Sequence, residues 1–538
     1  MKTMHILYQL TRADFFERVR RYSFLVILCL AAFAAYAYLP ARTATYLTLG
    51  LGNARGIYNS AWTGGATALL TSALLSLPGF YLVKNAIERD QRTGVGQIIA
   101  TTPLKKFLYT LGKALSNFAV LAVLVGCIAV AAGVVQLIRG EDLHIDLLAL
   151  VTPFLFVTLP TMALVAALAV LFETIAWLRS TGGNVIYFVL WMGSLLFTFA
   201  VSSQALNKGY TVSVTTDFLG IIALLASMTA TARAAFPGYH SSFAIGGTGV
   251  QGPVQTFVWS GVQWTPQLVA GRLMWIAGAI GIALFAAVFF HRFDPVKEGR
   301  KRATLPPSSR LSELEEIALP ATYVRLTPLV SQRRKFRFVA MLQAELRVMC
   351  KGTPWWWYLI AIGLIVAGWF APLSVGSLLL AFAWIWPLRL WSAMGNREMY
   401  YQTNRFIFAT LFPLRRQLPA TWLAGVLVTV LLGSGVVGHL ILAGSWANVL
   451  AWAVAAVFIP TLALTLGIWS GSSKLFEVFY MLIWYLGPIN HIPQLDYTGM
   501  TNAALTLHMP MMYGISALFL GAAAVVGRRR QLQSEGTS

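Results

Sequence analysis

Charged residues are scarce in this sequence, and their scarcity excludes an ordinary soluble protein. Only 11% of the 538 residues are Asp, Glu, Lys or Arg, whereas 57% are hydrophobic. Apolar runs such as 23–40 and 116–138 recur along the chain, and each is long enough to cross the ~30 Å hydrocarbon core of a bilayer. Because lipid offers no hydrogen-bond partners to the backbone, such runs must be helical. The sequence therefore predicts an all-α polytopic membrane protein.

Residues that build metal or redox sites are also few. The three cysteines, Cys29, Cys127 and Cys350, lie far apart, and their spacing fits neither a metal site nor a disulfide framework. The seven histidines are scattered along the chain. This scatter disfavours an integral membrane enzyme, which would need clustered catalytic groups near one interface.

A nucleotide-binding motif is missing as well. A phosphate-binding loop needs the pattern G-x-x-x-x-G-K-[ST] between a strand and a helix. Here Gly112–Lys113 is followed by Ala114, has Phe107 in place of the first glycine, and opens an apolar helix. We therefore expect that the chain binds no cofactor of its own and is not itself an enzyme.

The hydrophobic pattern predicts about twelve transmembrane helices, six on each side of a polar stretch. That stretch, 291–335, is charged and contains Pro306 and Pro307, and it is too short for a folded domain. We interpret it as a cytoplasmic linker between a first half, 1–290, and a second half, 336–538. The predicted spans are 23–40, 61–83, 108–138, 147–171, 184–201, 268–290, 355–370, 373–388, 419–443, 447–470, 476–489 and 508–527.

Lys and Arg outnumber Asp and Glu by 40 to 19, and their positions explain the excess. With a cytoplasmic N-terminus, all but six of these cations fall in cytoplasmic segments, as is usual in membrane proteins. The sequence therefore predicts a multi-pass protein of the plasma membrane with both termini in the cytoplasm, whose partner is the lipid bilayer and not nucleic acid. The six exceptions are Arg42, Arg55, Arg139, Lys208, Arg233 and Arg272.

Two stretches mix apolar and charged residues at helical spacing, 6–22 before the first span and 336–352 before the seventh. Each is either a charged flank or an amphipathic helix that lies in the membrane interface. Because one precedes each half, the interfacial helix is the favoured interpretation.

The two halves repeat one another. Glu88, Thr93 and Pro103 recur 310 positions later as Glu398, Thr403 and Pro413, and Lys105 and Lys106 recur as Arg415 and Arg416. Three further matches follow in the same order, 159–164 with 459–464, 186–191 with 479–484, and 217–220 with 496–499. Because six is an even number, the copies enter the membrane in the same direction. The sequence thus predicts parallel repeats related by a pseudo-twofold axis along the membrane normal.

The stretch "ERDQRTGVGQIIATTPLKKFLYTLGK" (88–113) resembles the first cytoplasmic loop of ABC-2 type transporter permeases. An acidic residue, a glycine turn, a Thr-Pro-Leu with basic residues and a Gly-Lys are all present in that loop. The second half keeps Glu398, Pro413 and the two arginines but has Asn404 and Trp422 at the places of the two glycines.

The resemblance implies the membrane subunit of an ATP-driven exporter. ATP and Mg²⁺ would be bound by two copies of a separate ABC ATPase, docked on residues 84–113 and 389–418. The residues implied to couple ATP hydrolysis to transport are Glu88, Thr93, Pro103, Lys105, Lys106, Glu398, Thr403, Pro413, Arg415 and Arg416. For the four basic residues, a role in membrane topology is an equal alternative. The apolar composition favours a lipophilic or amphipathic cargo, such as a drug, an antibiotic, a lipid or a hydrophobic peptide.

Other segments and other classes of transporter leave alternatives open. Pro160 and Pro460 lie inside matched spans, where proline causes either a packing kink or a hinge. The resemblance implies that the Gly-rich stretch 221–264 closes the exit. The alternative function is a twelve-span secondary, proton-coupled efflux carrier; against it, the predicted spans contain almost no acidic residues, and Glu173 lies near a cytoplasmic end.

Overall fold

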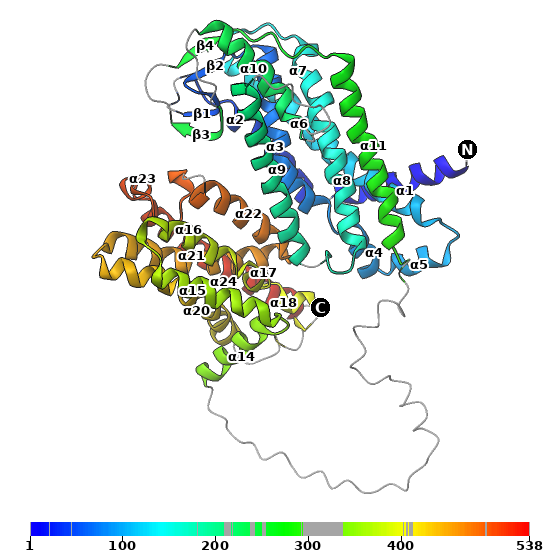
Figure 1. The fold of residues 1–538 in the computed structure, drawn as a ribbon. Coiled ribbons are helices and arrows are strands. Elements are labelled where there is room, and N and C mark those ends of the chain that lie inside the picture. Colours follow the sequence, from blue (N-terminus) through cyan, green and yellow to red (C-terminus); the bar gives the residue numbers. More distant parts are fainter. Residues whose placement is uncertain are drawn as a thin grey trace.

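The computed structural model shows a mostly helical membrane protein in which the two halves form separate helical bundles (Figure 1). The residues that the structure describes are 2–536 apart from 21, 43, 45, 180, 209–216, 218, 237–242, 250–253, 292, 294–336, 402, 405–406, 408–412 and 490–491. The predicted linker, 291–335, lies outside the described residues except for His291 and Phe293.

The elements follow one another with few long connections. In the first half the helices are α1 (Lys2–Val19), α2 (Tyr22–Tyr38), α3 (Ser60–Val83), α4 (Ala86–Arg92), α5 (Val95–Thr101), α6 (Lys106–Arg139), α7 (Leu147–Pro153), the π-helical turn η1 (Phe154–Thr158), α8 (Leu159–Thr174), α9 (Thr181–Lys208), α10 (Ile221–Ala235) and α11 (Pro266–Phe289). In the second half they are α14 (Phe338–Cys350), α15 (Trp355–Phe370), α16 (Leu373–Ile385), α17 (Leu388–Ser392), α18 (Arg397–Tyr400), α20 (Pro413–Leu442), α21 (Trp446–Ser470), α22 (Lys474–Trp484), η3 (Tyr485–Ile489), η4 (Pro493–Leu495), α23 (Asn502–Thr506) and α24 (Met509–Gly536).

Every predicted span contains a helix, but not every helix has the length of a span. Within the described residues, eight helices are long and apolar enough to cross a membrane, or nine if the bent pair α14–α15 is counted as one. The other four predicted spans contain shorter helices. These are α2, α15, α16 and α22, with 17, 16, 13 and 11 residues. The structure therefore gives a polytopic helical membrane protein with eight full-length helices where the sequence predicts twelve.

Helices occur at both stretches that were predicted to be amphipathic, but only α14 has its apolar and polar residues clearly on opposite faces, and α1 does not. α1 packs on α6, and α14 packs on α20, so each lies against the first long helix after the loop of its own half. The axes of α14 and α15 differ by 109°, because the chain turns at Gly352, whose φ is +82°, and Pro354 starts α15. A helix nearly perpendicular to the next apolar helix has the orientation expected at a membrane interface.

The first half also contains a small sheet, which the sequence analysis did not predict. Its strands are β1 (Tyr46–Leu51), β2 (Ala54–Gly56), β3 (Phe243–Gly249) and β4 (Gln255–Phe257), in the order β3-β1-β2-β4. The pairs β1–β2 and β1–β3 are antiparallel, and β2–β4 is parallel. The stretch 221–264, predicted to close the exit, thus contains one helix and two strands that pair with the segment before α3.

The core of the first half forms around α3, which is buried along most of its length. Small residues let its neighbours approach closely. A Cβ at Gly64 would lie 2.4 Å from the carbonyl oxygen of Leu150, so only glycine allows α7 to pack at this distance. Aromatic rings fill the rest of the space, for example Phe80 stacked on Tyr187 with 3.5 Å between their centroids.

Candidate functional site

The first loop, residues 84–113, consists of two short helices between α3 and α6. Asn85, with φ of +103°, directs the chain into α4, and Gly94, with φ of +77°, separates α4 from α5. A positive φ is strained for most residues but not for glycine. Pro103 lies exposed between α5 and α6, where its missing N–H breaks no helical hydrogen bond.

Glu173, at the end of α8, binds the start of this loop. Its buried carboxylate accepts hydrogen bonds from the backbone amides of Asn85, Ala86, Ile87 and Glu88 at 2.5–3.3 Å. A carboxylate at a helix N-terminus satisfies free amides and offsets the positive end of the helix dipole. The contact ties α4 rigidly to the end of a long apolar helix.

A second polar cluster joins α4 to α1 and α6. The Lys113 ammonium is fully buried and lies 2.7 Å from both Asp14 and Asp90. The Tyr109 hydroxyl donates a hydrogen bond to Asp90 at 2.7 Å, and Arg89 pairs with Asp14 at 3.8 Å. One buried cation thus compensates two carboxylates, so loss of Lys113 would leave Asp90 as a costly uncompensated charge.

The second loop, residues 389–418, is attached through Glu398. This carboxylate is 6% exposed and accepts hydrogen bonds from Gln417 at 2.8 Å and from Arg528 of α24 at 3.3 Å. The preceding residue, Arg397, pairs with Glu345 of α14 at 3.3 Å. The second loop is thus bound both to its amphipathic helix and to the C-terminal helix.

The contacts of the two loops correspond at an offset of 308, whereas the sequence match used 310. In each loop an arginine pairs with an acid of the preceding amphipathic helix, and the next residue accepts a hydrogen bond from a side chain 19 residues further along. By these contacts Glu398 corresponds to Asp90 and not to Glu88. The half-buried Glu88 instead donates its backbone amide to Glu173.

The remaining residues predicted to couple ATP hydrolysis lie at the ends of the short helices or on the surface. The Thr93 hydroxyl donates to the carbonyl of Arg89 at 3.0 Å, and the Thr403 amide donates to the carbonyl of Glu398 at 2.9 Å. Lys105, Lys106 and Arg415 are exposed and Arg416 is partly exposed. Pro413 begins α20, and its side chain lies outside the described part.

The two halves touch each other where α22 meets α9 and the end of α3. The Asn184 amide donates a hydrogen bond to Glu477 at 2.5 Å, and the Lys474 ammonium donates to the backbone carbonyl of Lys84 at 2.9 Å. Glu477 is fully buried, and its Oε1 atom has no hydrogen-bond partner. This acid was missed by the sequence analysis, because it stands at the edge of a short apolar segment. The sequence did contain one indication: Glu477 lies 293 residues after Asn184, which is the offset at which 186–191 matches 479–484.

The helices α9 and α22 make matched contacts within their own halves. The Tyr187 hydroxyl donates to the carbonyl of Ser76 and the Tyr480 hydroxyl to that of Trp384, both at 2.9 Å. The Trp191 indole donates to the carbonyl of Ala73 at 2.9 Å. Its counterpart, from Trp484 to Ala381, measures 2.8 Å.

The matched prolines occupy different backbone settings. Pro160 is the second residue of α8, which directly follows the π-helical turn η1. Pro460 lies inside α21, which is α-helical throughout. Both are buried. A π-helical turn together with a proline is a recognised cause of a bend, so the first half has the stronger local break.

The second half has a groove of about 550 Å³ between α20, α21 and α24. Its lining contains no charge, and its two polar side chains satisfy each other, since the Trp422 indole donates to the Thr461 hydroxyl at 2.8 Å. Gly514 and Gly521 form the wall contributed by α24. In the first half α11 packs closely on α8 and α6 instead. A groove of this size and chemistry fits an apolar organic molecule.

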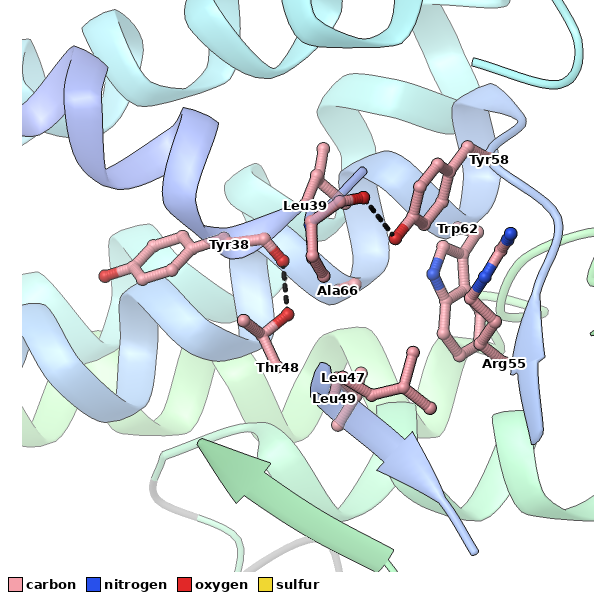
Figure 2. Close-up of a pocket in the computed structure, with 10 residues that line it drawn as sticks. Tyr38, Leu39, Leu47, Thr48, Leu49, Arg55, Tyr58, Trp62 and Ala66 are labelled. Carbon is pink, nitrogen blue, oxygen red and sulfur yellow. Dashed lines mark hydrogen bonds between the residues drawn. The ribbon is translucent and has the colours of Figure 1, made fainter. Parts of the chain in front are cut away.

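A second cavity, shown in Figure 2, lies beside the sheet between the end of α2, β1 and the start of α3. Tyr58 and Trp62 line it, and the Thr48 hydroxyl donates to the Tyr38 carbonyl at 2.5 Å. Its volume of about 10 Å³ is roughly the space of one water molecule. It therefore holds no organic ligand.

Within the described part of the chain, no three His, Cys, Asp or Glu side chains gather closely enough to hold a metal ion. Comparison with family models, with curated proteins and with solved structures gives no match. Inference about function therefore depends on the contacts described above.

Proposed function

We propose that the chain is the membrane subunit of an ATP-driven exporter of the ABC-2 permease type. Two copies of a separate ATPase would dock on residues 84–113 and 389–418 and hydrolyse ATP there. The observation that carries the proposal is the pair of corresponding contact sets at the two loops. Each set binds a loop to an amphipathic helix through an arginine and to an apolar helix through a buried carboxylate.

The matched contacts support two parallel repeats. Tyrosine and tryptophan side chains of α9 and α22 bind the same pair of carbonyl positions on α3 and α16. In addition, Asp217 and Asp496 each begin a turn that ends in a glycine with positive φ, at Gly220 and Gly499. Such agreement is expected if each half has six spans of the same direction, with both termini on the cytoplasmic face of the plasma membrane.

Both loops have the mechanical connection that a coupling element needs. A push on α4 reaches α8 through Glu173 and reaches α1 and α6 through Lys113. Buried charges that are held on several sides cannot move singly without a large electrostatic cost. A displacement of the loop would therefore move the attached helices together with it.

The groove of the second half supports a lipophilic cargo. It opens beside Leu518, which is 77% exposed on the outer side of α24, and in a bilayer that surface faces hydrocarbon. A molecule dissolved in the lipid would enter it without losing hydration. Drugs, lipids and hydrophobic peptides share this property.

The decisive experiment uses inside-out vesicles from cells that produce the full chain with its own partner proteins, and from matched cells that lack it. ATP-dependent accumulation of a lipophilic fluorescent dye, sensitive to vanadate and unaffected by a protonophore, is expected only with the chain. Accumulation that needs no ATP, or dye transport equal in both vesicle types, would contradict the proposal.

One observation favours a proton-coupled carrier as the second candidate. Glu477 is a fully buried acid at the contact between the halves and has an unpartnered oxygen. Buried acids of this kind form proton relays in secondary transporters. In the same vesicles, a carrier would accumulate dye when a pH gradient is imposed without ATP, and a protonophore would abolish the signal.

A further inference from the structure

The contact between Asn184 and Glu477 joins equivalent positions of the two halves. The segments 186–191 and 479–484 match at an offset of 293, and the same offset takes residue 184 to residue 477. A residue meets its own counterpart only where it lies on the axis that relates two copies. The hydrogen bond between these side chains thus marks the pseudo-twofold axis of the proposed repeats.

The polar layer around this contact is confined to one end of α9 and α22. Lys84 donates hydrogen bonds to the side chain of Asn184 and, at 3.1 Å, to the carbonyl of Leu178, and Lys474 donates to the carbonyl of Lys84. Further along the same two helices the halves meet through apolar rings. Phe188 lies 5.7 Å from Trp484, and Trp191 lies 5.3 Å from Tyr485, measured between centroids.

The contact between Asn184 and Glu477 gains little free energy from being closed, because the hydration lost by its charged groups offsets the hydrogen bonds formed. Burying Glu477 and Lys84 removes their hydration, and the Asn184 side chain compensates this only in part, because one carboxylate oxygen of Glu477 stays without a partner. When the halves separate and water enters, that hydration returns. At this end of α9 and α22 the closed arrangement is therefore held by a modest free energy, in contrast to the apolar ring contacts further along the same helices.

The layer is directly connected to the first loop. Lys84 lies two residues before the first residue of α4, and its carbonyl is the acceptor for Lys474 of the other half. Glu173 binds the first amides of α4 two residues further along. Any displacement of α4 changes the position of the Lys84 backbone and hence of its contact with the second half.

We propose that Asn184 and Glu477 form the closure of the passage between the halves at the end that carries the loops, and that movement of α4 opens it. This inference depends on the proposed transport function. The cargo would then cross the membrane along the pseudo-twofold axis between the halves, and Asn184 and Glu477 would block its way in this structure.

Cross-linking tests the closure. In a variant without Cys29, Cys127 and Cys350 that retains dye transport, Asn184→Cys and Glu477→Cys are joined by a short reducible bis-thiol reagent. Transport in the vesicles described above should fall about tenfold, as expected when a required open state is removed, and should return after reduction. Unchanged transport with complete cross-linking would overturn the closure while leaving the exporter function intact.

A matched pair inside one half controls for rigidity and for the reagent. Ser72 and Thr158 are buried, and their hydroxyl oxygens are 3.2 Å apart within the first half. Cross-linking Ser72→Cys to Thr158→Cys should leave transport within about twofold of its value before treatment, because no contact between the halves is fixed. A loss equal to that of the 184–477 pair would overturn the inference. Absence of any transport before cross-linking would overturn the proposed function and the closure together.

Exchange of the two side chains gives a test that needs no reagent. The single variant Asn184→Glu places a second carboxylate against Glu477, and Lys84, which donates to the side chain at position 184, offsets only part of the repulsion. We expect passive, ATP-independent dye leak to rise about tenfold, which corresponds to a destabilisation of the closed arrangement by about 1.4 kcal/mol. The double variant Asn184→Glu with Glu477→Asn restores the pair across the axis and should return the leak to the original level. Equal leak in the single and double variants would contradict the inference.

Discussion

Asp90 and Glu398 accept corresponding hydrogen bonds, each from a side chain that lies 19 residues further along the chain. The donor is a tyrosine hydroxyl in the first case and a glutamine amide in the second. The residue before each acid is an arginine that pairs with the preceding amphipathic helix. Two loops with different sequences thus keep the same attachment points, and this agreement defines the first variants to test.

Removing the charge of either acid should uncouple the loop to which it belongs. Loss of one member of a buried charge pair costs about 2–5 kcal/mol, so we expect Asp90→Asn and Glu398→Gln each to lower ATP-dependent dye transport about tenfold or more. Glu17→Gln is the control, since its side chain is 44% exposed and exposed pairs contribute about 0–1 kcal/mol. Glu88→Gln tests which acid of the first loop corresponds to Glu398. If it lowers transport as much as Glu398→Gln does, the offset of 310 is favoured over that of 308.

Lys113→Met should destabilise the first half strongly. The substitution leaves Asp90 buried without its cation and leaves Asp14 with Arg89 alone, at 3.8 Å; an uncompensated buried charge costs about 3–5 kcal/mol. We expect a lower Tm in detergent, measured by the loss of the monodisperse peak in fluorescence-detected size exclusion after heating. Lys105→Met, at an exposed position, should change stability by less than about 0.5 kcal/mol. The triple variant that also carries Asp14→Asn and Asp90→Asn should recover much of the lost stability; no recovery would contradict charge imbalance as the cause.

Filling the groove should impair cargo binding without disturbing the fold. A Cβ at Gly514 or Gly521 would meet its nearest atom at 3.7 or 3.8 Å, so a larger side chain can extend from α24 into the groove. We expect Gly521→Leu to reduce labelling of the second half by a lipophilic photoreactive probe about tenfold, since an occupied pocket excludes its ligand. Gly281→Leu on α11 is the matched control, because nothing lies within 4 Å of that position. Equal labelling of both variants would exclude the groove as a binding site.

The stability of the contact between the halves should depend on pH near neutrality. Burial lowers the pKa of Lys474 to about 7; the charge of Glu173 opposes this shift, and that of Lys84 adds to it. In the unfolded chain the pKa of lysine is about 10.4, so the unfolded state binds more protons between about pH 7 and 10 and stability rises with pH in this range. We expect Tm in detergent to rise from pH 7 to pH 9, and Lys474→Met to flatten this rise. An equal slope in both proteins would exclude Lys474 as its source.

Side-specific labelling tests the direction of the two halves. Thr101 and Arg415 are exposed in the two loops, and Asp142 is exposed beyond the other end of α6. In the cysteine-free background, single cysteines at 101 and 415 should react with an impermeant thiol reagent from the cytoplasmic side, and one at 142 from the opposite side. Reaction of 101 and 415 from opposite sides would exclude parallel repeats.

The long apolar helices could be predicted closely from the sequence, because a span is defined by local composition. The predicted span 108–138 compares with α6, Lys106–Arg139. Two short segments also lie where they were predicted: the spans 373–388 and 476–489 compare with α16, Leu373–Ile385, and with the consecutive helices α22 and η3, residues 474–489, although both are shorter than the eight long helices. Where such a helix ends is decided by packing against distant residues, which no local pattern records.

Contacts between distant segments account for what the sequence could not provide. Identical residues in the two loops suggested an offset of 310 positions, whereas the hydrogen bonds of Asp90 and Glu398 correspond at an offset of 308 positions. Buried charge requires partners from other helices, so neither Lys113 nor Glu477 could be recognised as buried from its neighbours in the chain. The sheet has the same origin, because β1 and β3 are almost 200 residues apart.

That separation has a consequence for synthesis. β1 leaves the ribosome long before β3 and β4, and four long helices must be inserted between them. Until then β1, between α2 and α3, has an unpaired edge that is open to chance pairing or proteolysis. A chain that stops after α8 would keep this edge permanently, so the first half should complete its fold only after β3 and β4 have been synthesised.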